Sequence, residues 1–137
     1  MTEKDLLRYC ELRRKEERLA RRYREEEERL SSIPGPRSPL SAGGGNGGGA
    51  DNLIQIIDRR KKILSDIEAV KREIILAESA LDKAEVALAS ESERRVFSCL
   101  YRDDMDIKQC AEYTHYSISN VYKIRTAILT AVTPIPT

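Results

Sequence analysis

The sequence predicts an all-α protein, in which a long antiparallel helical hairpin or coiled coil precedes a C-terminal three-helix helix-turn-helix domain. Charged residues make up 34% of the chain and aromatic residues 5%, a composition typical of long helices rather than a large globular core. Apolar residues recur at helical spacing throughout residues 51–89. Two shorter helical patterns, separated by a brief turn, follow within residues 106–129.

Residues 1–32 are predicted as a charged coiled-coil segment, with the helix itself over 3–32. This helix holds no glycine or proline, and its ten basic and nine acidic side chains alternate, so oppositely charged residues can pair four positions apart. The acids match the bases too closely to favour an RNA-binding arm. Its heptad seam has two polar interruptions and runs through Tyr9, Leu12, Glu16, Leu19, Tyr23, Glu26 and Leu30.

Residues 33–50 are predicted as a linker. Pro34, Pro36 and Pro39 disfavour helix, and all seven glycines of the chain lie between positions 35 and 49. The glycine cluster lacks the Lys-Ser/Thr of a phosphate-binding P-loop and follows no strand, so it does not indicate a nucleotide site.

Residues 51–89 predict the longest helix, whose seam is apolar at ten of eleven positions, with Arg60 as the exception. Such a stripe requires a partner, which is either the first helix folded back as a hairpin or a second copy of the chain. Because Leu and Ile are mixed in the seam, the number of helices in the coiled coil stays open. In an antiparallel hairpin, residues of the two helices that are equally far from the linker lie opposite each other. This register places Tyr23 and Glu26 opposite Arg60, where an aromatic ring and a carboxylate offset the desolvation of the guanidinium.

Residues 90–132 are predicted as the three-helix domain. Ser90 with Glu93, and Asp106 with Gln109, have the spacing of capping boxes that begin its first two helices. Residues 133–137 contain two prolines and are expected to be a frayed tail. The expected core consists of Phe97, Leu100, Ile107, Cys110, Ala111, Val121, Ile124 and Ile128.

The helix-turn-helix prediction depends on spacing as well as periodicity. A tight crossing requires a small residue in the first helix, a turn residue that tolerates positive φ, and a β-branched residue that packs back between the helices. Ala111, His115 and Val121 meet these requirements, and histidine is among the residue types enriched at positive φ. Ser117 is expected to cap the second helix.

The outer face of this second helix is the candidate DNA-binding surface. Asn can read adenine with two hydrogen bonds and Ser can contact either kind of base edge, whereas Lys, Arg and Tyr suit phosphates. A backbone amide at the helix start is a further phosphate donor. An ordinary polar face of a three-helix domain is the alternative interpretation. The candidate residues are Ser117, Ser119, Asn120, Tyr122, Lys123, Arg125 and Thr126.

Charge and residue counts limit the function further. The net charge is +1, and residues 90–137 carry six basic and six acidic side chains, so one copy should bind DNA weakly and with strong salt dependence. Cys10, Cys99 and Cys110 are far apart and are expected to be reduced structural thiols in the cytoplasm. With one histidine, no cysteine pair and no catalytic constellation, we expect no metal, no cofactor and no enzyme activity. No stretch approaches a membrane span.

The last third of the chain resembles the fourth region of bacterial sigma factors, the helix-turn-helix that reads promoter DNA. Placed after a long charged helical segment, it is similar to the small phage-encoded transcription regulators of the ArpU/RinA type. The resemblance implies a sequence-specific regulator that binds double-stranded DNA with or alongside RNA polymerase, in the cytoplasm of a bacterial host cell. It rests on the Ser-Glu-Arg start and on Val96, Leu100, Tyr101, Ile107, Ala111, Tyr116, Ser117, Val121 and Arg125.

Two other functions fit the same pattern. A coiled coil that builds a ring, with helix-turn-helix units gripping DNA, would serve as a phage DNA-packaging adaptor of the small-terminase kind. Alternatively, the helix-turn-helix could dock on polymerase or another protein, which the neutral local charge favours. We expect a homo-oligomer formed through the coiled coil. Its mass separates the first two functions, since a monomer or dimer favours the regulator and a large ring favours packaging.

Overall fold

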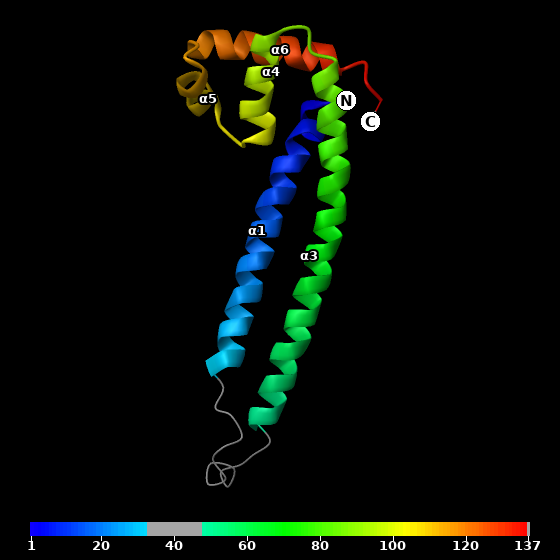
Figure 1. Cartoon of the computed structure of the whole chain (residues 1–137), viewed down its shortest axis with the longest axis vertical. Coiled ribbons are helices and arrows are strands. Elements are labelled where there is room, and N and C mark those ends of the chain that lie inside the picture. The colour runs from blue at the N-terminus through cyan, green and yellow to red at the C-terminus, as the bar shows by residue number, and fades with distance from the viewer. Residues whose placement is uncertain (33–47, 137) are drawn as a thin grey trace. The chain divides into compact units, whose positions relative to one another are not determined.

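A computed structural model describes residues 1–32 and 48–136 of the chain (Figure 1). Helices and short connections account for all of these residues, without a strand, and the predicted all-α class is confirmed for this part of the chain. The elements are α1 (Glu3–Ser32), α3 (Gly48–Val86), α4 (Glu91–Phe97), the π-helical turn η1 (Ser98–Arg102), α5 (Ile107–Thr114) and α6 (Ile118–Val132).

The two long helices agree closely with the predicted segments. Helix α1 covers the expected range, with Glu3 and Asp5 in its first turn and Arg29 in its last. These charges interact favourably with the helix dipole and stabilise the helix. Helix α3 begins at Gly48, before the expected start, and ends at Val86. The predicted linker, residues 33–50, lies outside the described residues except for 48–50, which form the first turn of α3.

The described residues form two compact units, one within the range 15–71 and the other made of 1–14 with 72–136. The boundaries between the units fall inside α1 and α3 rather than at the predicted segment ends. The first turns of α1 therefore belong to the same unit as α4, η1, α5 and α6.

In the unit of residues 15–71, the later half of α1 contacts the earlier half of α3. The guanidinium of Arg60 donates to the Tyr23 hydroxyl over 2.9 Å and lies 5.1 Å from the ring centroid, which confirms the predicted pairing of these two residues. The carboxylate beside Arg60 is Glu27, at 3.3 Å, rather than the expected Glu26. Glu26 is buried and binds Arg59 and Arg29 instead, at 3.2 and 2.6 Å.

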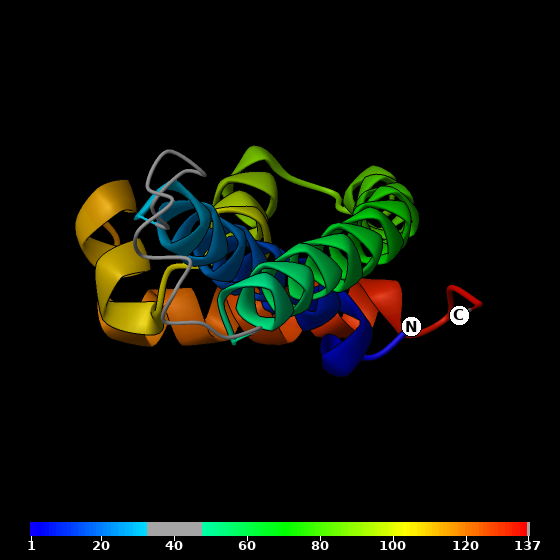
Figure 2. The same cartoon turned by 90° about the horizontal axis from the view of Figure 1, so that it is seen from below.

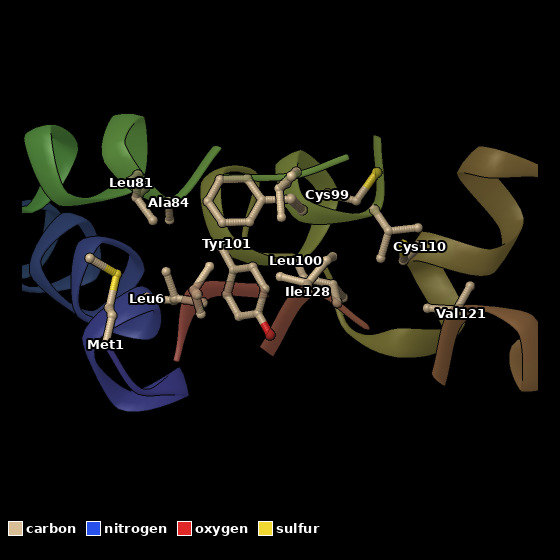
Figure 3. Packing of buried hydrophobic residues seen from close by; sticks show 14 of the residues in the cluster. Met1, Leu6, Leu81, Ala84, Cys99, Leu100, Tyr101, Cys110, Val121 and Ile128 are labelled. Carbon is tan, nitrogen blue, oxygen red and sulfur yellow. The ribbon is translucent and has the colours of Figure 1, made fainter. Parts of the chain in front are cut away.

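The core of the other unit is built from all of its helices (Figure 3). Phe97 and Tyr101 lie at its centre with ring centroids 5.4 Å apart, and both are almost fully buried. The expected core is confirmed, with Ile107 and Ile124 packed against it as partly buried residues. The end of the long apolar seam also joins this core, through Leu81 and Ala84 of α3 and Leu88 just after it. The contribution of α1, which supplies Leu6, was not predicted from the sequence.

Residues 133–136 differ from the predicted frayed tail. Thr133 and Ile135 continue the helix end, since their amides donate to the carbonyls of Leu129 and Val132 over 3.1 and 3.0 Å. Ile135 is half-buried against the core, and the Met1 amino group donates to the carbonyls of Thr133 and Ile135. Apolar burial at Ile135 thus orders a segment whose prolines disfavour regular helix.

Candidate nucleic-acid interface

Helix α5 and the turn after it have the predicted backbone geometry. The Asp106 carboxylate accepts from the Gln109 amide over 2.7 Å, and the Gln109 side chain accepts from the Asp106 amide over 2.9 Å, which confirms the capping box. The helix ends at His115, whose φ of 63° and ψ of 23° are left-handed, as expected for the turn position. This conformation stops α5 and redirects the chain into α6.

Ser117 begins α6 as predicted. Its hydroxyl accepts from the Asn120 amide over 3.1 Å, while its own backbone is extended. The hydroxyl therefore satisfies a backbone donor that the helix start would otherwise leave unpaired. The short turn between Thr114 and Ile118 leaves α5 and α6 in contact within the same unit.

The rotation of α6 about its own axis is fixed by its inner face. Val121, Ile128 and Val132 are fully buried, and α6 packs against α4 and passes close to the first turns of α1, drawn in dark blue (Figures 1 and 2). With 3.6 residues per turn, Ser119, Lys123 and Thr126 lie together on the opposite side. The exposed candidates are Ser117, Ser119, Asn120, Tyr122, Lys123 and Thr126.

Arg125, the remaining candidate, differs from the expectation that it faces solvent. Its Nη2 atom donates to Glu3 Oε1 over 2.8 Å and lies 2.7 Å from Oε2, and its side chain is half-buried. The same carboxylate accepts from the Tyr101 hydroxyl over 3.5 Å. The hydrogen bond to Glu3 raises the pKa of Arg125. The sequence holds no local signal for this ion pair, because its partners lie at opposite ends of the chain.

Other basic residues near the interface make contacts within the protein. Arg102 binds Asp82 and Glu85, both at 2.8 Å. The guanidinium of Arg95 lies over the ring of Tyr116, 5.7 Å from its centroid. Lys108 and Lys123 are exposed. The positive charge that α5 and α6 offer a nucleic acid is therefore carried mainly by these two lysines.

A cleft of about 580 Å³, which was not predicted from the sequence, lies beside α4 and the end of α5. Its lining combines the exposed arginines Arg94 and Arg95 with Tyr113, which is 64% exposed, and His115. Acidic Glu91 and Asp103 also line it, which limits its attraction for an anion. The adjacent arginines and the off-seam tyrosine were the available sequence signals.

The cysteines are buried, and their surroundings oppose ionisation. The Cys10 thiol donates to the Tyr101 carbonyl over 3.1 Å. Burial raises the pKa of Cys10 to about 11 and that of Cys110 to about 12, and it also raises the pKa of Cys99. Thiols that hold their protons are poor nucleophiles and poor metal ligands. Within residues 1–32 and 48–136, no group of three or more His, Cys, Asp or Glu side chains could hold a metal ion.

None of the described helices combines the length and apolar character needed to cross a membrane. The comparisons with other proteins provide no relative from which to transfer a function. Neither a known protein family, nor a curated protein, nor a solved structure matches this chain.

Proposed function

We propose that this protein is a sequence-specific, double-stranded DNA-binding transcription regulator, phage-encoded and acting with host RNA polymerase in the bacterial cytoplasm. In this proposal α5, the turn at His115 and α6 form a helix-turn-helix, with α6 as the recognition helix. The observation that carries the proposal is the left-handed His115 between two capped helices, followed by exposed Ser119, Asn120 and Lys123. These features match the geometric requirements of the motif.

The proposed contacts divide into two kinds. Ser119 and Asn120 lie in the first turn of α6, where side chains of a recognition helix reach base edges. Lys123 is one turn later than Ser119 on the same side and suits a phosphate. The major groove is about 12 Å wide, which admits a helix of this kind.

The proposal includes self-association, because a single copy presents little positive charge. Side chains on α3 support it, with Ile75, Leu76 and Val86 exposed by 64, 72 and 86%. A dimer would place two recognition helices on half-sites about 34 Å apart and double the phosphate contacts. Measuring the mass of the chain in solution, with and without DNA, tests this part. A monomer or dimer agrees with a regulator, whereas a large ring would favour the DNA-packaging adaptor.

A selection experiment tests the DNA-binding proposal. The full chain should enrich a preferred duplex from a random pool at low salt. Asn120→Ala should relax the preference at one base position, by about 1–3 kcal/mol, whereas Lys123→Ala should weaken all sequences alike and reduce the salt dependence by about one contact. Lys71→Ala, an exposed lysine on α3, is the control and should change neither. If both α6 variants bind the selected duplex as the parent does, α6 is not the recognition helix.

A protein-docking module is the second candidate, favoured by one specific observation. Tyr113, Ile118 and Tyr122, which lie on the short helix pair α5 and α6, are exposed by 64, 49 and 50%. Aromatic side chains are enriched in protein interfaces. Purified RNA polymerase that binds the parent but not Tyr113→Ala or Ile118→Ala, together with failure to select any duplex, would favour docking over DNA recognition.

A further inference from the structure

The ion pair between Glu3 and Arg125 joins the first turn of α1 to the middle of α6. Both carboxylate oxygens lie within 2.8 Å of Arg125 Nη2, and the two side chains are 28 and 33% exposed. The pair borders an open cleft of about 310 Å³ whose lining also includes Tyr122 and Ile107. An anion in this cleft could therefore approach the guanidinium.

Arg125 is the half-buried basic residue of α6. With 3.6 residues per turn it lies one turn beyond Val121 and Tyr122, on the side of α6 turned toward the rest of the unit and away from Ser119 and Lys123. A phosphate that reaches it must therefore lie at the flank of α6, over the cleft beside Tyr122. Arginine binds phosphate oxygens through paired donors better than lysine does. In this structure the Nη2 donor of Arg125 is directed to a carboxylate of the same chain.

We propose that Glu3 competes with DNA phosphate for Arg125, so that the pair is a latch that opens when α6 docks on DNA. This inference rests on the proposed DNA-binding function and adds a mode of regulation to it. Partly exposed ion pairs are weak, so a closely placed phosphate can replace the carboxylate. Until docking, the latch withholds one cation from the interface. This lowers non-specific attraction, which depends on the number of phosphates neutralised.

Tyr101 makes a second, longer contact with the Glu3 side chain, over 3.5 Å. Its ring is buried in the core and its hydroxyl contacts Glu3 Oε2, so the carboxylate has a support besides Arg125. Glu3 can therefore remain near its place when the guanidinium swings toward a phosphate. Its charge then opposes the phosphate, and the latch should weaken DNA binding even in its open form.

A cycle of variants tests the latch on the full chain with the selected duplex. Glu3→Gln should raise DNA affinity, on the order of tenfold at low salt, and steepen the salt dependence by about one phosphate contact. Arg125→Ala alone should change affinity little, yet it should abolish the gain when combined with Glu3→Gln. Glu112→Gln, an exposed carboxylate on α5, removes the same charge without touching Arg125 and should leave the salt slope unchanged.

Several outcomes would overturn the latch. Equal gains from Glu3→Gln and Glu112→Gln would show a general charge effect. A loss from Arg125→Ala as large as that from Lys123→Ala would show that breaking the pair with Glu3 does not offset the contact of Arg125 with DNA in the parent. Thermal unfolding identifies a variant that fails to fold, and Glu3→Asp, whose shorter side chain withdraws the carboxylate, then replaces Glu3→Gln.

A spectroscopic measurement separates the latch from the function on which it rests. The guanidinium NMR signal of Arg125 should shift when the selected duplex is added to the parent. If the duplex binds and this signal stays in place, the latch is wrong while DNA binding stands. If no duplex binds the parent at low salt, the DNA-binding proposal itself fails, and the latch fails with it.

Discussion

The Arg60 guanidinium both covers the ring of Tyr23 and donates a hydrogen bond to its hydroxyl. This contact accommodates the single polar residue of the long α3 seam. Each of the neighbours Arg60 and Glu26 keeps one buried atom without a hydrogen-bond partner among the described residues, Nε of Arg60 and Oε2 of Glu26. Glu26 is the more deeply buried residue, with 6% of its surface exposed. A buried charge with an unpaired oxygen costs desolvation that an apolar side chain does not.

Glu26→Met should therefore leave the protein equally stable or stabilise it by about 1 kcal/mol or more. Arg29 and Arg59, which lose a partner, are 58 and 50% exposed and remain hydrated. Urea unfolding measures the change, with Glu25→Met at an exposed position as the control. A loss above about 2 kcal/mol would show that the ion pairs of Glu26 outweigh its burial cost.

His115 provides a test of the turn. A non-glycine residue in the left-handed region costs the folded state about 1–2 kcal/mol, and glycine avoids this cost. Glycine also makes the unfolded chain more flexible, which offsets part of that gain in stability. His115→Gly should thus keep or slightly raise the melting temperature, whereas His115→Val should destabilise by roughly 1–3 kcal/mol. Lys108→Val, within α5, controls for adding a β-branched residue. If valine lowers the free energy of unfolding equally at both positions, the left-handed conformation at position 115 is contradicted.

Leu6 tests whether the first turns of α1 are part of the candidate DNA-binding unit. The side chain is fully buried in the same cluster as Phe97 and Ile128. Leu6→Ala should cost about 2–5 kcal/mol of unfolding free energy, whereas Ile54→Ala, at a 57% exposed position, should stay within about 0.5 kcal/mol. Residues 90–132 alone should fold only marginally. A fragment that melts as hot and as cooperatively as the whole chain would contradict this dependence.

Alkaline pH should destabilise the protein. Burial raises the pKa of Tyr101 from 10.0 to about 12 and that of Cys10 from 9.0 to about 11. The folded state therefore holds these protons more tightly than the unfolded state, and the resulting stability is complete below about pH 9 and is lost as the pH rises toward 12. Urea midpoints across this range should fall, and Cys10→Ala should make the decline shallower. A decline that is identical in parent and variant would show that Cys10 does not contribute.

Local features of the structure could be predicted from the sequence because each depends on a few neighbouring residues. The capping box of Asp106 with Gln109, the left-handed His115 and the cap at Ser117 all follow from short-range spacing. The pairing of Tyr23 with Arg60 could also be predicted, because a single polar residue in an apolar seam restricts which partners suit it.

Long-range contacts were beyond the sequence alone. Arg60 binds Glu27 rather than Glu26 because long side chains reach along a helix, so counting residues does not fix the ionic partner. Nothing near Arg125 indicates that Glu3 binds it. The burial of Leu6 against the C-terminal helices likewise depends on packing between distant segments, which helical periodicity does not reveal.

The most direct measurement of the central proposal is cleavage of DNA by a reagent attached to α6. A cysteine introduced as Ser119→Cys lies on the exposed side of α6, whereas burial and raised pKa values protect the native thiols from labelling. An iron chelate attached there should cut the selected duplex at a few adjacent nucleotides facing one major groove, and a chelate at Ser79→Cys on α3 should not. Uniform cutting from position 119, or an equal pattern from position 79, would contradict α6 as the recognition helix.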